Sequence, residues 1–257
     1  MKKVGKGLGV LTIAILAIGI NVVGFKKTKD NQQLQQIDQI AETIVSQKKQ
    51  LTTLEEMIGK AYIDEKKEFL QPTLTKETID KIENNLARIK VSAEDFDINA
   101  KALPDEVATF AQKKEDLQTA FNGIKKQFNL QSEILALFTN ETIDWQTVTN
   151  DVVLTTDVTE KQLKDIKEKL QAIEIPNWQP NAEEYVSFAQ AQLNRIQELN
   201  VNFDEMLVDD TITESATYDR YYSVSESIAQ VRNPEIKAQF LEQLDSVSQQ
   251  LGMGSVY

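Results

Sequence analysis

Two similar stretches decide the fold: LTKETIDKIENNLARI at residues 74–89 and VTEKQLKDIKEKLQAI at residues 158–173. In both, apolar residues recur at steps of three and four, the spacing of a helix that buries one face. Thr75 and Thr159 stand where a helix N-cap is expected, and Gln162 follows Thr159 at the spacing of a capping box. We therefore predict two short helices of the same design, each capped by threonine.

Longer apolar series flank these two stretches. The first repeats every seven residues, at Ile37, Ile44, Leu51 and Ile58. The second runs from Val107 to Phe138 and predicts one helix of about 35 residues, and the third runs from Tyr185 to Met206. Seams that are apolar on one side and charged on the other favour an all-α fold of antiparallel helical bundles of the spectrin or coiled-coil type.

The residues that end one helix and start the next follow a similar pattern three times. Each long helix ends in an apolar pair followed by polar residues: Ala61–Tyr62, Leu137–Phe138 and Met206–Leu207. A proline stands near the start of each later helix: Pro104, Pro180 and Pro234. We predict an elongated array of degenerate three-helix repeats that share long helices, at residues 26–126, 127–200 and 201–257. The rival interpretation is chance similarity among helical segments.

The N-terminus holds an uncharged run, LGVLTIAILAIGINVVGF at residues 8–25, with lysines on both sides. As a helix it would be about 27 Å long, near the lower limit for a hydrocarbon core of about 30 Å. We predict a transmembrane anchor behind a short basic cytosolic tail at residues 1–7. The alternative is a cleaved signal peptide that ends near Ala17 and Gly19. Both interpretations export the bulk of the chain.

Lysines at both ends make the orientation of this span nearly balanced. We expect the N-terminus inside and the bulk of the chain outside, in a single-pass protein of the cell membrane. The anchor helix makes the lipid bilayer the first expected partner. The opposite topology, with a cytosol-facing helical region, is the alternative.

The composition of the 257-residue chain restricts its chemistry. It contains no Cys and no His, so thiolate chemistry and the commonest general base and metal ligand are missing. The net charge of -12 would repel the phosphate backbone of a nucleic acid. We expect no enzyme, no catalytic residue, no cofactor, no metal and no nucleic-acid partner.

Three kinds of residue remain as candidates for binding. Acidic clusters at Asp64–Glu65, Glu94–Asp97 and Asp209–Asp210 could hold a hard cation, although solvated loops explain them better. Trp145 and Trp178 are predicted in loops, where they would stack on the sugars of a cell-wall glycan or pin the loop to a bundle. Near Arg220, an interaction face or a packed core would equally explain Tyr218, Tyr221 and Tyr222.

Two longer stretches carry a family resemblance: KAYIDEKKEFLQPTLTKETIDKIENNLARI at residues 60–89, and LALFTN followed by TTDVTEKQLKDIKEKLQAI between residues 135 and 173. They resemble the extracellular helical repeats of the mid-cell anchoring proteins that position the division ring in Gram-positive cocci. The resemblance covers roughly residues 30–250 and implies a single-span protein whose helical outer region engages peptidoglycan. The short tail departs from that family, because it has no room for the inner domain that contacts the tubulin-like ring protein.

These observations predict a membrane-anchored surface protein that binds the cell-wall glycan or another envelope protein, in cell division or cell-wall organisation. The alternative is a cytosol-facing, spectrin-like regulator of division or of the membrane. A wall hydrolase that uses paired carboxylates is the third hypothesis, and no spacing in the sequence singles out such a pair.

Overall fold

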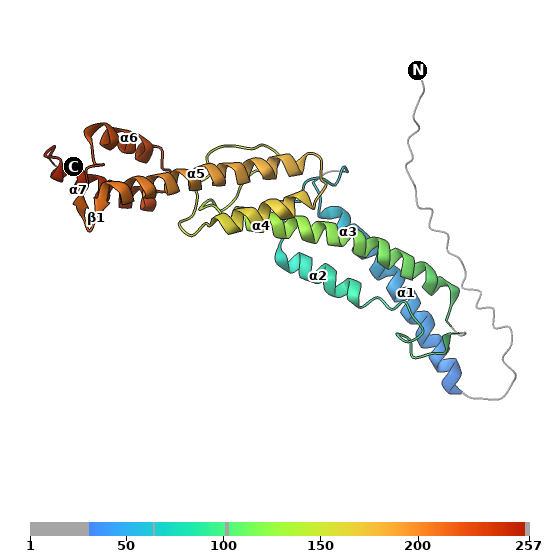
Figure 1. The fold of residues 1–257 in the computed structure, drawn as a ribbon. Helices are drawn as coiled ribbons and strands as arrows, with labels where there is room; N and C mark the ends of the chain where they lie inside the picture. The colour runs from blue at the N-terminus through green and yellow to red at the C-terminus, as the bar shows by residue number, and fades with distance from the viewer. Residues whose placement is uncertain (1–30, 64, 101–102, 255–257) are drawn as a thin grey trace, which may run out of the picture. The chain divides into compact units, whose positions relative to one another are not determined.

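A computed structural model describes residues 31–63, 65–100 and 103–254, and these residues form an essentially helical protein (Figure 1). Its seven helices are α1 (Asn31–Lys60), α2 (Lys76–Ala87), α3 (Asp105–Leu135), α4 (Glu160–Gln171), α5 (Trp178–Met206), α6 (Tyr218–Ala229) and α7 (Pro234–Gln250). Strands β1 (Leu207–Val208) and β2 (Thr211–Ile212) pair antiparallel. The helical class predicted from the periodicity is confirmed. The chain divides into two units after Thr43, and the packing described below concerns residues 44–257.

The membrane anchor predicted at residues 8–25 lies outside the described residues, as does the tail at residues 1–7. Within the ranges that the structure describes, no helix combines the length and the apolar character that a bilayer span requires.

The short helices α2, α4 and α6 are built to one plan. Each has 12 residues and begins after a threonine whose side chain accepts a hydrogen bond from a backbone N–H in the first turn. The caps predicted at Thr75 and Thr159 are confirmed, including the capping box with Gln162, and Thr217 is a third cap. Each helix buries three residues at the same positions: Ile79, Ile82 and Leu86; Leu163, Ile166 and Leu170; Tyr221, Val224 and Ile228.

We expect Thr159→Ala to lower the free energy of unfolding by about 1 kcal/mol, because the first turn of α4 would lose its side-chain acceptor. Thr159 Oγ1 accepts from Gln162 N at 3.3 Å, and Gln162 Oε1 accepts from Thr159 N at 2.8 Å. Thr156→Ala is the matched control, since Thr156 is exposed in the loop before the helix. Urea denaturation measures both variants, and equal destabilisation would contradict a capping role.

A short β-hairpin precedes each of these helices, and the sequence analysis missed all three. The paired residues are Tyr62 with Leu70, Phe138 with Leu154, and Leu207 with Ile212. The same backbone bond closes each pair: Gln71 N to Ala61 O at 2.8 Å, Thr155 N to Leu137 O at 2.9 Å and Thr213 N to Met206 O at 2.9 Å. Phe138, predicted at the end of a helix of about 35 residues, is instead a strand residue, because α3 ends after 31 residues at Leu135.

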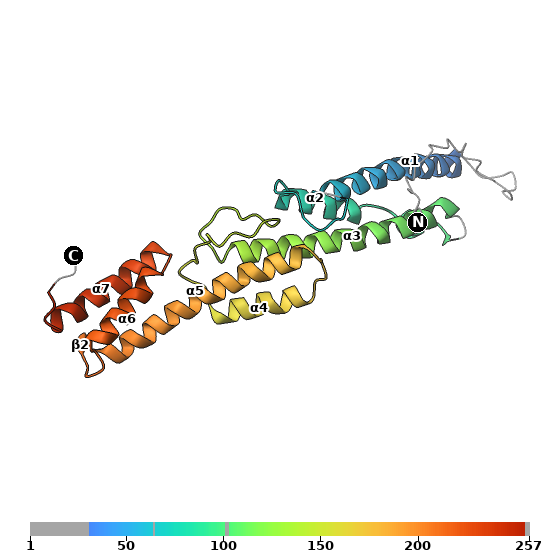
Figure 2. The same cartoon turned by 90° about the horizontal axis from the view of Figure 1, so that it is seen from above.

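The hairpins and helices define three segments, which we call the first (residues 61–127), second (137–192) and third (206–250). The long helices connect them, since α3 packs against both α2 and α4, and α5 packs against α4, α6 and α7 (Figures 1 and 2). The N-terminal two thirds of α3, as far as Ile124, contribute to the core around α2. Its C-terminal part, from Leu130 to Ile134, contributes to the core around α4. On α5 the core changes in the same way between Leu193 and Leu199.

The predicted helix starts are confirmed at two prolines and wrong by two residues at the third. Pro104 caps α3, and Pro234 opens α7 behind the side-chain cap of Asn233. Helix α5 begins at Trp178, so Pro180 lies within its first turn, where proline is still tolerated because no intrahelical donor is needed there. Trp178 is therefore a helix residue, not a loop residue.

Candidate partner-binding surface

The two tryptophans lie in one aromatic cluster in the second core. Trp178 is 0% exposed, and its ring centroid is 5.8 Å from that of Trp145. Trp145 also meets Tyr185 edge to face at 5.7 Å. An indole that is fully buried has no face for a sugar, so the glycan-stacking role proposed for Trp178 does not fit this conformation. Its place in the core explains it instead.

Trp145 is half-buried and holds the long hairpin loop of the second segment, residues 139–153, against α5. Two side chains of α5 secure the same loop through its backbone. Asn181 Nδ2 donates to Trp145 O at 2.8 Å, and the Tyr185 hydroxyl donates to Asp144 O at 2.9 Å. Burial raises the pKa of the Tyr185 hydroxyl. The loop is thus fixed to α5 at Asp144 and Trp145, while most of its other residues are exposed.

The three tyrosines of α6 separate into two groups. Tyr221 is 5% exposed and belongs to the third core, so it is not part of an open interaction face. Tyr218 and Tyr222 are 55% and 57% exposed, outside the buried stripe of the helix. Tyr222 meets the buried Tyr221 edge to face at 5.5 Å, and the Tyr218 hydroxyl donates to Leu251 O at 3.0 Å. Both exposed rings therefore have fixed supports.

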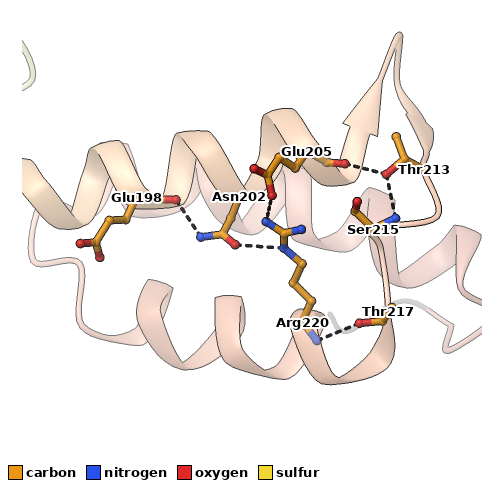
Figure 3. Close-up of polar contacts among 7 residues, drawn as sticks. All are labelled: Glu198, Asn202, Glu205, Thr213, Ser215, Thr217 and Arg220. Carbon is orange, nitrogen blue, oxygen red and sulfur yellow. Dashed lines mark hydrogen bonds and ion pairs between the residues drawn. The ribbon is translucent and has the colours of Figure 1, made fainter.

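Arg220 ties this part of α6 to α5 (Figure 3). Its Nε donates to Asn202 Oδ1 at 3.0 Å, and its guanidinium forms an ion pair with the carboxylate of Glu205. Asn202 is held in turn, since its Nδ2 donates to Glu198 O at 2.8 Å. Arg220 therefore orients the tyrosines by fixing their helix, while its charge is used within the protein.

Three residues of the acidic clusters have structural roles: Asp95, Asp209 and Asp210. Asp209 and Asp210 form the turn between β1 and β2, both at positive φ, the geometry that a two-residue hairpin turn requires. Asp95 Oδ2 accepts from Val91 N at 2.8 Å and from Ser92 N at 2.9 Å. Asp64 lies outside the described residues. In the remainder, no group of three or more acidic side chains is placed to hold a metal ion.

The hydrogen bonds from the Val91 and Ser92 backbone hold the pKa of Asp95 below its ordinary value. A carboxyl with a lowered folded pKa stabilises the fold above its unfolded pKa, and this contribution is lost as the pH falls through the folded pKa. We expect Asp95→Asn to remove that part of the acid dependence. Carboxyl titration by NMR, together with denaturation midpoints at several pH values, measures it. An Asp95 pKa at or above the ordinary value would contradict the expectation.

A recurrent glutamine was missed by the sequence analysis. Gln127, Gln192 and Gln250 each donate from Nε2 to a backbone carbonyl of their own hairpin: Glu68 O at 2.8 Å, Val152 O at 3.1 Å and Asp210 O at 2.8 Å. Gln192 and Gln250 also accept through Oε1, from Leu154 N and Ile212 N, both at 3.1 Å. The signal was present, because Gln192 follows Thr159 at the same spacing as Gln250 follows Thr217.

Comparison with known proteins adds no relative: no family model, no curated protein and no solved structure matches the chain significantly.

Proposed function

We propose that this protein is a membrane-anchored helical binding protein of the cell surface, which engages the cell-wall glycan or another envelope protein. The observation that carries the proposal is the repetition of one structural plan, since hairpin, Thr-capped helix and closing helix occur three times on shared long helices. Arrays of this kind bind through extended surfaces made by neighbouring repeats. The anchor at residues 8–25 and the likeness to mid-cell anchoring proteins are parts of the same proposal.

The repeats proposed at residues 26–126, 127–200 and 201–257 are supported by the division of the core. Three separate apolar clusters fill the bundle, and each is centred on one of the short helices α2, α4 and α6. Phe69 is the exception, since it leaves the first segment and packs in the second core. Such a residue couples neighbouring repeats, as nearest-neighbour interfaces do in other helical arrays.

Tyr218 and Tyr222 are the proposed contact residues. Tyrosine offers a large ring with few rotatable bonds, so its ordering on binding costs little entropy. Both rings are already supported by neighbours, and both are more than half exposed. Trp145, which is less exposed, is a further candidate in the second segment.

Retention of residues 30–257 on isolated cell wall tests the wall branch of the proposal. We expect Tyr218→Ser/Tyr222→Ser to reduce retention, because the two rings supply the proposed contact. Val45→Ser/Ile63→Ser is the matched control, since both side chains are exposed and apolar and lie outside α6. Retention no greater than that of an unrelated helical domain would remove wall binding and leave an envelope protein as the partner to seek.

Protease treatment of intact cells distinguishes the proposed topology from a cytosol-facing one. An external helical region is digested in intact cells, whereas a cytosolic regulator is spared until the cells are lysed. A tagged copy in growing cells then addresses the process, since enrichment at the septum supports a division role and uniform labelling contradicts it.

A further inference from the structure

The second strand of each hairpin, which we call the return strand, has the same environment within its own segment. Glu68, Val152 and Asp210 stand two residues before the paired residues Leu70, Leu154 and Ile212. The glutamine of the segment donates to each of their carbonyl groups. The three return strands can therefore be compared residue by residue.

In the first and second segments, the following segment adds a further set of donors to the return strand. Asn177 Nδ2 donates to the carboxylate of Glu68. Arg232 donates to Val152 O at 3.0 Å and Asn150 Oδ1 at 2.9 Å, and Asn233 Nδ2 donates to Leu154 O at 2.8 Å. All three donor residues lie just before the closing helix of their segment, at the start of α5 or α7. One donor of the following segment thus reaches the first of these strands, and three hydrogen bonds from two residues reach the second.

Side chains of these two strands are also buried. In the first return strand Phe69 is 9% exposed, inside the core of the following segment, and in the second Val152 is 0% exposed. Each of these two return strands therefore has a buried side chain, although the strand is the outer one of its own hairpin.

The third return strand is open over the described residues. Asp210 and Thr211 are exposed, and so is Val208 on the paired strand, at 58%. Helix α7 ends after Gln250, where Gly252 at φ 78° lets the chain turn back and Met253 N donate to Ser248 O. In the part of the chain that the structure describes, no later segment supplies the donors that cover the first two strands.

The charge of this region indicates what would cover it. Residues 201–257 contain ten acidic and three basic residues. Two of the acidic residues, Asp209 and Asp210, form the hairpin turn with exposed side chains. Among the described residues, neither carboxylate forms an ion pair, whereas Arg220 is already paired with Glu205. The surface combines backbone acceptors, two carboxylates and one apolar side chain.

We propose that the third hairpin, residues 207–213, docks a cationic segment of a partner protein. Arginine or lysine of the partner pairs with Asp209 and Asp210, and neighbouring amide donors take the position that Asn233 takes on the second return strand. Val208 supplies the apolar contact. The hairpin does not include Tyr218 or Tyr222, so variants of the hairpin and variants of the tyrosines test the two proposed contacts independently.

Fluorescence anisotropy with the full chain tests the proposal. The probe is a labelled peptide rich in arginine and asparagine, and a peptide of the same length with glutamate in place of arginine is its control. We expect the cationic peptide alone to bind, and Asp209→Asn/Asp210→Asn to weaken it about tenfold at low salt, because both charges of the turn are lost. Asparagine adopts positive φ readily, so this variant retains the hairpin turn.

Asp157→Asn/Asp165→Asn is the matched control variant, since it removes two exposed carboxylates from the second segment. We expect its affinity to stay within about twofold of that of the unmodified chain, the residual effect of distant screened charges. Equal weakening by both pairs would overturn the proposal in favour of diffuse attraction to an acidic protein. Absence of binding by the cationic peptide, or NMR shifts centred away from residues 207–213, would overturn it as well.

Discussion

Trp178→Ala is expected to lower the free energy of unfolding by about 3 to 5 kcal/mol, the largest effect that we predict for a single substitution in this chain. Trp178 is 0% exposed and begins α5, where its ring packs beside Trp145 in the second core. Truncation removes apolar burial and leaves a cavity that the helices around it fill only in part. Urea denaturation followed by circular dichroism measures the loss.

Two further variants make this prediction specific. Trp145→Ala should cost less, because Trp145 is only half-buried. Trp178→Phe should also cost less than Trp178→Ala, since phenylalanine keeps much of the ring, and the Trp178 Nε1 has no hydrogen-bond partner in the described structure to lose. If Trp178→Ala left the stability unchanged but weakened glycan binding, Trp178 would be a surface residue and its assignment to the core would fail.

The helices could be predicted from sequence because their causes are local. The spacing of apolar residues indicates which face of a helix is buried. A threonine with a polar residue three positions later indicates where a helix starts. Thr75 and Thr159 were identified in this way, and each accepts the expected backbone hydrogen bond.

The hairpins could not be predicted in the same way. Strands of two residues are too short to show an alternating pattern, and the paired positions Phe138 and Leu154 are far apart in sequence. The turn at Asp209–Asp210 also lacks the Asn-Gly signal of a two-residue hairpin. Pairing across loops of such different length depends on the surrounding bundle.

The candidate surface was recovered in part. The sequence identified the cluster of tyrosines but not its division. Helical geometry supplies the division, because Tyr218 and Tyr222 are four residues apart and share a face, while Tyr221 aligns with Val224 and Ile228 of the buried stripe. Trp178 was predicted in a loop because the start of α5 was placed at Pro180, two residues too late.

Gln192→Leu is expected to lower the free energy of unfolding by about 2 to 3 kcal/mol, although leucine is as large and more apolar. The side-chain amide of Gln192 makes two hydrogen bonds to the second return strand. Its Oε1 accepts from Leu154 N, and its Nε2 donates to Val152 O. Leu154 and Val152 are 1% and 0% exposed, so water does not easily replace the lost partner. The cost comes mainly from leaving the Leu154 N–H unsatisfied, because Val152 O loses one donor but keeps the bond from Arg232. Gln197→Leu is the control on an exposed face of α5.

The three glutamines form a graded series that tests this explanation. Gln250 makes the same two bonds, but its hairpin turn is exposed, so water can replace the amide and Gln250→Leu should cost less. Gln192→Glu keeps the acceptor for Leu154 N and loses the donor to Val152 O, and should fall between Gln192→Leu and the unmodified chain near neutral pH. If Gln250→Leu were as costly as Gln192→Leu, the glutamine would act through its packing, and the hydrogen bonds to the hairpin would not be the cause.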